Sequence, residues 1–293
     1  MYHQPVLLEK IIQVLEPTAN QNFIDATFGE GHLSFVLAEK TSPEGKILAF
    51  EWDPVLYREG LKKIKELKME KRIKLVNSNF RSIKKVVKEE NFTQVRGIVF
   101  DLGISNWHYQ KSGRGFSFKQ DEPLDMRLNP RLKITAFEII NYFSYQDLVS
   151  IFKNYGEERS AERIAQAIIE KRRKKKIETS KELAQIIADV KKTKRRIHPA
   201  TQVFMALRSF INQELENIEK GIKDGYQVIE PGAKIIVLTF NGLEDQIVKK
   251  VFRFLKQKGA MVITKNVIRP SQAEIIKNPA ARSSKLRAIR KDA

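Results

Sequence analysis

Three acidic residues follow apolar stretches that have the composition of buried strands. Asp25 ends the first stretch, Glu51 follows the second, and Asp101 ends the fourth. The carboxyl ends of parallel strands meet at one edge of a sheet, and ligands of open α/β proteins bind at that edge. We therefore expect the three carboxylates to line one pocket, rather than to cap three unrelated turns.

The first of these residues opens a loop with the sequence Asp-Ala-Thr-Phe-Gly-Glu-Gly-His over 25–32. Glycines in such a loop let a ligand approach the backbone, although ordinary turn chemistry also uses them. Glu51 follows at about the 20-residue spacing at which an acid binds ribose hydroxyls. The pattern indicates a cofactor that contains adenosine. Glu30 inside the loop disfavours a diphosphate and favours a cationic or zwitterionic ligand such as S-adenosylmethionine (SAM).

Strand and helix patterns alternate through the first part of the chain and would position these residues. We expect strands at 22–27, 46–53, 73–79 and 95–102, with helices that end near residues 40, 68 and 90. Alternation of helices with nearly continuous apolar strands predicts a parallel sheet covered on both faces.

The alternation stops after residue 108. The next segment, 109–131, has the composition of a loop, and Thr179 and Glu182 have the spacing of a capping box. We expect helices at 135–143, 145–154, 157–173, 181–190, 199–222 and 243–257, and strands at 234–240 and 260–265. The simplest fold is a doubly wound α/β domain made of 1–108 and 215–293, interrupted after its fourth strand by a helical domain at 109–214.

The chain has 293 residues and a formal net charge of +19. The excess is uneven: residues 1–108 hold 16 basic and 14 acidic side chains, residues 109–214 hold 22 and 13, and residues 215–293 hold 16 and 8. Basic runs lie at 171–176 and 191–196. The distribution favours a polyanionic partner such as nucleic acid. The alternative is lysine enrichment from a biased genome or a hot habitat.

The composition excludes several kinds of site. The absence of cysteine rules out disulfides, thiolate zinc sites and iron–sulfur clusters. No apolar stretch is long enough to span a bilayer, and the start of the chain lacks the pattern of an export signal. We expect a soluble, cytoplasmic protein without a metal. Zinc is disfavoured because the histidines are widely spaced at His3, His32, His108 and His198.

Separated segments of the chain share their sequence and their order with a known family. These segments are His3–Glu9, Asp101–Gly103, Arg114–Phe118, Leu124–Arg127, Tyr155–Glu158, His198–Thr201, Leu243–Asp245 and Asn278–Arg287. They resemble the RsmH (MraW) family, the SAM-dependent methyltransferases of the exocyclic N4 of cytidine in 16S rRNA. The resemblance implies a class I, Rossmann-like fold with a helical insert that recognises the substrate. It also implies SAM as cofactor and small-subunit rRNA, or the small ribosomal subunit, as partner.

The resemblance also assigns candidate residues. By position in the family, the SAM contacts are Gly31, His32, Leu33, Glu51, Phe80, Asp101 and His108. We predict that Asp101 is the chemical centre, either as the acceptor for the N4 protons or by ordering the methionine part of SAM. Asn106 follows in the same loop and is predicted to be an auxiliary acceptor.

The chain departs from the family at several of these positions. It has Gly31-His32-Leu33 where Gly-Gly-His is usual, Glu51 for Asp, Asn106 for Ser, His108 for Gln, and Asn241-Gly242 for His-Ser. The last change leaves open a catalytically weak or silent RNA-binding factor for ribosome assembly. A nicotinamide-dependent dehydrogenase is disfavoured because no hydride-acceptor motif is present, and methylation of DNA or protein is a narrower alternative.

Other residues have both a functional and a structural interpretation. The aromatic residues Trp107, Tyr109, Phe116 and Phe118 could stack on a base or pack the loop. His198 before Pro199 is typical of a helix start. The basic residues Arg282, Lys285, Arg287 and Arg290 are expected to form a C-terminal tail, either for binding phosphates or as solvated charge.

Overall fold

The computed structural model describes residues 6–192 and 198–292, which form two compact units. The first unit combines the chain up to Gly103 with the chain from Leu215 onward, and the second is Ile104–Glu214. The first boundary therefore lies after Gly103, five residues before the predicted boundary after residue 108. Residues 104–108 belong with the insert, where the His108 ring packs edge-on against Phe116 at a centroid distance of 5.4 Å.

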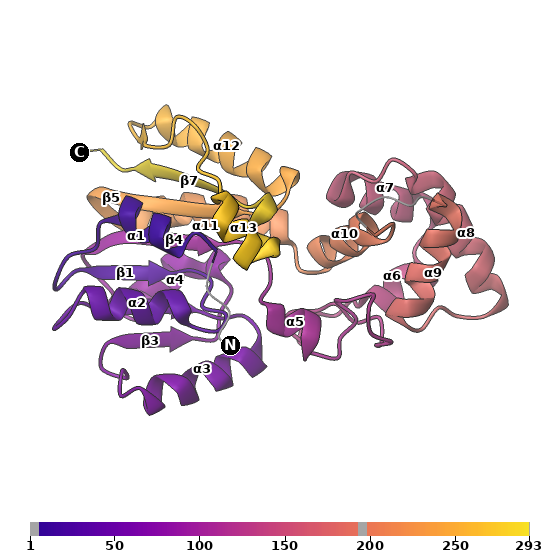
Figure 1. Ribbon diagram of the computed structural model, residues 1–293, viewed down its shortest axis with the longest axis horizontal. Coiled ribbons are helices and arrows are strands. Elements are labelled where there is room, and N and C mark those ends of the chain that lie inside the picture. Colours follow the sequence, from indigo (N-terminus) through magenta and orange to yellow (C-terminus); the bar gives the residue numbers. More distant parts are fainter. Residues whose placement is uncertain (1–5, 193–197, 293) are drawn as a thin grey trace. The chain divides into compact units, whose positions relative to one another are not determined.

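One mixed sheet forms the centre of the first unit (Figure 1). Within the described residues its order is β3-β2-β1-β4-β5-β7-β6, with β1 to β5 parallel and β7 antiparallel to both neighbours. This arrangement confirms the predicted doubly wound α/β fold. The strands are β1 (Asn22–Asp25), β2 (Ile47–Phe50), β3 (Ile73–Val76), β4 (Val95–Asp101), β5 (Ile229–Thr239), β6 (Met261–Val262) and β7 (Lys285–Arg290).

Helices cover both faces of this sheet, as the continuous apolar strands require. Side chains such as Leu37 pack one face, and side chains such as Ile222 pack the other. Each fully buried aliphatic side chain contributes about 1.5–3 kcal/mol. The first layer is α1 (Leu8–Leu15), α2 (His32–Lys40) and α3 (Pro54–Glu66), and the second is α4 (Ile83–Glu89), α11 (Glu214–Val228) and α12 (Gly242–Lys256). The shorter elements are η1 (Phe80–Ser82), α13 (Gln272–Lys277) and η2 (Pro279–Ser283).

The second unit is helical and has its own apolar core, which includes Ile139, Phe152 and Leu207. The predicted capping box is confirmed, because the Thr179 hydroxyl accepts a hydrogen bond from the N–H of Glu182 and the Glu182 carboxylate accepts one from Thr179. The helices are α5 (Asn106–Gln110), α6 (Ala136–Tyr142), α7 (Tyr145–Gly156), α8 (Ala161–Lys174), α9 (Ser180–Lys191) and α10 (Thr201–Ile211).

The prediction of one long helix over 199–222 is wrong. Helix α10 ends at Ile211, and α11 begins at Glu214. Gln213 between them has a φ of +51°, in the left-handed region that a helix cannot continue through. The break places Asn212, whose side chain binds the backbone of a distant loop in the same unit.

The predicted basic tail is also wrong in part, because Lys285–Arg290 is the strand β7 inside the sheet. Leu286, Ala288 and Ile289 are fully buried. Side chains alternate between the faces of a strand, so Leu286 and Ala288 pack in one core cluster and Ile289 packs in the other. Arg287 binds the carboxylate of Asp245 on α12 at 2.6 Å. Burial alone raises the pKa of Asp245, but the hydrogen bond and charge of Arg287 outweigh it and lower that pKa.

Candidate active site

The loop after β1 contains two glycines that are needed for different reasons. Gly31 precedes α2 with a φ of +86°, and a Cβ there would lie 2.6 Å from the rings of Phe28 and Phe35. Gly29 has a φ of +56°, and no atom of the described residues lies within 4 Å of the position that its Cβ would take. Packing therefore requires Gly31, whereas Gly29 borders open space that a ligand could use.

Asp25 is fully buried at the end of β1 and holds the loop in place. Its carboxylate accepts hydrogen bonds from the Thr27 N–H at 3.1 Å and from the Ser34 hydroxyl at 2.7 Å. The Thr27 hydroxyl in turn accepts a hydrogen bond from the N–H of Asp101 at 2.8 Å. Burial raises the pKa of Asp25 to about 6 in spite of the hydrogen bond from Ser34. Asp25 and Thr27 thus connect the ends of β1 and β4.

Glu51 follows β2 and is 9% exposed. One carboxylate oxygen accepts the N–H of Gly29 at 2.9 Å, and the other accepts the N–H of Asp53 at 2.7 Å. Burial raises the pKa of Glu51 to about 8, although both backbone hydrogen bonds favour the charged form. The carboxylate is therefore fixed against the open side of the glycine loop, where its remaining lone pairs can accept hydroxyl groups.

Asp101 ends β4 with a buried carboxylate oxygen, Oδ1, that has no hydrogen-bond partner among the described residues. Burial, followed by the charges of Asp25 and Glu244, raises the pKa of Asp101 to about 7. A buried acceptor without a donor is costly, and such atoms are expected where a ligand supplies the donor. This atom therefore fits a ligand that carries N–H groups or positive charge.

The other predicted contacts of the first unit follow the same strand ends. His32 is the first residue of α2, and its neighbour Leu33 is buried in the core, so only the backbone of Leu33 is available to a ligand. Phe80 follows β3, is half-buried, and packs edge-on against Phe100 at 5.5 Å. These residues share the edge of the sheet that carries Gly31, Glu51 and Asp101.

Asn106 and His108 lie in the second unit, on α5. The Ser105 hydroxyl caps this helix by accepting the Trp107 N–H at 3.1 Å. His108 is buried with its ring between those of Trp107 and Phe116, each at a centroid distance of 5.4 Å. The role of Asn106 as an acceptor and that of His108 as a cofactor contact stay predictions.

Glu244 is a further carboxylate whose charge acts on Asp101, and the sequence did not identify it as a candidate site residue. It lies in the first turn of α12 with 2% exposure, and its carboxylate accepts the N–H of Phe240 at 2.7 Å and the amide of Asn241 at 2.5 Å. The Asn241 oxygen caps the helix by accepting the N–H of Glu244 at 3.0 Å. The spacing of an N-cap residue and a glutamate three positions later could have revealed this arrangement.

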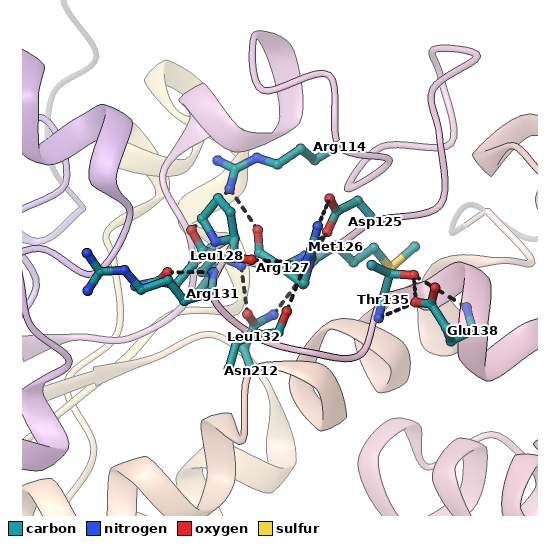
Figure 2. A network of polar contacts seen from close by, with 12 residues as sticks. Arg114, Asp125, Met126, Arg127, Leu128, Arg131, Leu132, Thr135, Glu138 and Asn212 are labelled. Carbon is teal, nitrogen blue, oxygen red and sulfur yellow. Dashed lines mark hydrogen bonds and ion pairs between the residues drawn. The ribbon is translucent and has the colours of Figure 1, made fainter.

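The family-like motifs of the insert form a polar network (Figure 2). Arg127 binds both oxygens of Asp125, at 2.7 and 2.8 Å, and donates to two backbone carbonyls as well. Arg114 donates to the carbonyls of Arg127 and Leu128. Asn212 accepts the Leu128 N–H at 2.7 Å and donates to the carbonyl of Met126 at 2.8 Å. These motifs therefore build the insert, because their side chains are used within it.

We expect Asn212→Ala to destabilise the insert by about 2–6 kcal/mol, because one buried and one partly buried backbone group lose their partners at roughly 1–3 kcal/mol each. The chain has two tryptophans, so a Trp52→Phe background leaves Trp107 fluorescence as a reporter of the insert during urea unfolding. The control is Asn154→Ala on α7, which removes an exposed hydrogen bond to the Ser150 hydroxyl and should cost about 1 kcal/mol or less. Equal effects of the two changes would contradict the role assigned to Asn212.

The structure distinguishes between the two interpretations of several residues. Phe116 is a core residue, and Phe118 packs against the core and stacks on the His198 ring at 4.2 Å. His198 is confirmed as a helix-start residue, because its Nδ1 accepts the N–H of Ala200 at 3.2 Å. Tyr109 is 37% exposed, but its hydroxyl accepts a hydrogen bond from Arg208 at 2.8 Å.

The described residues contain no group of three histidine, aspartate or glutamate side chains placed to hold a metal ion. Their helices are also too short or too polar to cross a membrane.

The fold and the carboxylate-lined edge together define the class of the protein, a Rossmann-like SAM-dependent methyltransferase. A crystal structure of a Clostridium thermocellum protein assigned as an rRNA methylase has the same fold, with a TM-score of 0.51 and 12% sequence identity over 100% of this chain and 99% of that one.

The chain belongs to the MraW methylase family, whose sequence model matches residues 1–292. Ribosomal RNA small subunit methyltransferase H of Persephonella marina is 40% identical to it over 293 residues, which cover 99% of each chain. The protein of the same name from Leptospira interrogans is 40% identical over 299 residues, covering 99% of this chain and 89% of its own.

Proposed function

We propose that the protein transfers the methyl group of SAM to the exocyclic N4 of a cytidine in small-subunit (16S) rRNA. The observation that carries the proposal is the buried Oδ1 of Asp101 at the ligand-binding edge of a methyltransferase fold, which has no hydrogen-bond partner among the described residues. Membership of the MraW methylase family and the names of the relatives support the substrate. A cytoplasmic location follows, because that is where small subunits are assembled.

The residues of the first unit fit SAM. Glu51 would accept the ribose hydroxyls, and the open space beside Gly29 would admit the ligand next to the backbone. Asp101 offers an acceptor to the amino groups at the junction of cofactor and base. When bound, SAM supplies the methyl group.

Cytosine N4 is a poor nucleophile because its lone pair is delocalised into the ring. An acceptor bonded to the N4 protons favours a pyramidal nitrogen and frees that lone pair. In this proposal Asp101 is the acceptor and takes the proton that N4 loses on methylation, with Asn106 as auxiliary acceptor. The base must be exposed for this step, as single-stranded RNA allows.

The departure at Asn241-Gly242 is compatible with an active enzyme. Asn241 caps α12 and binds Glu244 through its amide, so the local structure beside Asp101 is complete without the usual histidine. This observation favours catalysis over the silent RNA-binding alternative.

The insert also offers a surface for RNA at the end of α8. Within the basic run, Arg172 donates to the carbonyls of Ile140 and Phe143, and Lys175 pairs with Glu182 at 3.6 Å. Lys176 donates to the Tyr142 hydroxyl. The other three charges of the run, Lys171, Arg173 and Lys174, are exposed, and among the described residues they have no acidic partner. We include them as phosphate contacts.

The run at 191–196 is less suitable than its sequence suggested. Lys191 forms a salt bridge at 2.5 Å with Glu158, which is 2% exposed, so its charge is already neutralised. Residues 194–196 lie outside the described residues.

Changing Lys171, Arg173 and Lys174 together to Gln should weaken rRNA binding by roughly tenfold and reduce the salt dependence by about two logarithmic units per decade, because three phosphate contacts are lost. Affinity for SAM should not change. The matched control changes Lys65, Lys68 and Lys71, which are exposed in the first unit, to Gln. Equal binding by the two triple variants would reject this surface.

The proposed function is tested by incubating the protein with methyl-labelled SAM and small subunits from a strain that lacks it. We expect label that RNase releases. Label in protein or DNA would overturn the substrate assignment, and RNA binding without any transfer would support the silent factor.

A further inference from the structure

Glu244 and Asp101 lie at the ends of neighbouring strands in the first unit. β4 and β5 pair in parallel with Asp101 opposite Leu238, and the chain from β5 passes through Phe240 into α12. The Phe240 ring comes within 3.4 Å of the position of a Cβ on Gly103. The carboxylate of Glu244, held by the N–H of Phe240, is therefore beside the end of β4.

The two carboxylates differ in their hydrogen bonds. Glu244 accepts hydrogen bonds from Phe240 and from Asn241, and both stabilise a negative charge. The Oδ1 of Asp101 has no donor among the described residues. When two buried acids are close, the one with more donors takes the charge and the other keeps a proton to higher pH.

Among the described residues, the titratable groups whose charges act on Asp101 are Asp25 from β1 and Glu244 from α12. Asp25 is hydrogen-bonded to Thr27 and Ser34. The charge of the neighbouring acid Asp245 is compensated by salt bridges with Arg287 and Lys285. Burial first, and then these two acids, raise the pKa of Asp101.

We propose that Glu244 is a positioning residue that acts through Asp101: its negative charge favours the protonated form of Asp101 in the protein without ligand, and the N–H groups of a bound ligand then favour the carboxylate that the reaction needs. This inference rests on the proposed function only in one respect: the catalytic role of Asp101 comes from that proposal. The effect of Glu244 on the protonation of Asp101 is a property of the protein without substrate.

The experiment is a carboxyl-carbon NMR titration of the protein labelled at aspartate, with the Asp101 signal identified by its loss in Asp101→Asn. In Glu244→Gln the titration midpoint of Asp101 should fall by roughly half a pH unit or more, because a like charge is removed. Glu244→Ala removes the same charge without placing an amide against two donors, and serves if the Gln variant does not fold. Glu244→Asp keeps the charge, so the titration midpoint of Asp101 in this variant should remain closer to that of the parent protein.

Asp245→Asn is the matched control, since it removes one buried charge at the next position. We expect no shift of Asp101 in this variant. An unchanged Asp101 midpoint in folded Glu244→Gln and Glu244→Ala would overturn the proposal, as would an equal shift in Asp245→Asn.

Single-turnover methyl transfer gives a second readout. In Glu244→Gln the acid limb of its pH profile should move to lower pH with Asp101, whereas loss of a merely structural residue would lower the rate at every pH. If the protein proves not to methylate rRNA, the NMR titration still decides the role of Glu244.

Discussion

Asp101→Asn should reduce single-turnover methyl transfer by about 10²-fold or more, the range for a positioned acid–base group. Asparagine keeps the shape of the side chain but loses the charge and the capacity to take the proton from N4. The measurement uses saturating SAM and rRNA, so that it isolates the chemical step from binding.

The same variant separates the two roles proposed for Asp101. If the carboxylate accepts the N4 protons, the rate falls while the affinity for SAM is nearly unchanged. If it orders the methionine part of SAM, the dissociation constant rises as well. A folded Asp101→Asn protein that methylates at the parent rate would eliminate Asp101 as the chemical centre.

Glu51→Ala should weaken SAM binding at least tenfold. A carboxylate that binds two ribose hydroxyls makes charge-assisted hydrogen bonds of about 1.5–3 kcal/mol each. The loop also loses the acceptor for the N–H groups of Gly29 and Asp53. The control is Glu51→Asp, which restores the residue usual in the family and should remain within a few-fold of the parent. Calorimetry that shows unchanged affinity for folded Glu51→Ala would reject this assignment.

The raised pKa of Glu51 adds a pH dependence to SAM binding. The charged carboxylate is the better acceptor, so its contribution to SAM affinity should grow as pH rises through about 8. The titration of the ligand and of the other acids is common to the parent and to Glu51→Gln, so a comparison of the two proteins isolates Glu51. The plot of SAM affinity against pH should be flatter for Glu51→Gln than for the parent. Parallel profiles in the two proteins would contradict the contribution of Glu51.

The raised pKa of Glu51 has the opposite effect on folding stability in the absence of ligand: stability falls as pH rises. The folded protein holds the Glu51 proton more tightly than the unfolded chain, in which the pKa of Glu51 is 4.5. The stability that Glu51 contributes is therefore present in full below about 4.5 and is lost as pH rises through about 8.

The parallel part of the fold could be predicted because each strand is a short apolar run and each end carries a recognisable polar residue. β7 was not predicted because its basic residues Lys285, Arg287 and Arg290 resemble those of a charged tail. Its burial depends on pairing with β5 and on the distant carboxylate of Asp245, and a local pattern contains neither. The break at Asn212 has the same cause, because the partners of Asn212 are at Met126 and Leu128.

The three acids at the strand ends of the candidate site could be predicted from the sequence, but their neighbour Glu244 could not. Topology alone brings Asp25, Glu51 and Asp101 to one edge of the sheet. Glu244 was not identified as a member, because its position depends on how β5 turns into α12. The hydrogen bonds that distinguish an occupied carboxylate from the unpartnered Oδ1 of Asp101 are also set by the folded chain.

The most direct test of the central claim is the identity of the methylated nucleoside. Small subunits from a strain without the protein are incubated with SAM and the purified protein, and their rRNA is digested to nucleosides for mass spectrometry. We predict N4-methylcytidine with the parent protein and its near absence with Asp101→Asn. A methyl group on the cytosine ring, on another base or on ribose would contradict the account.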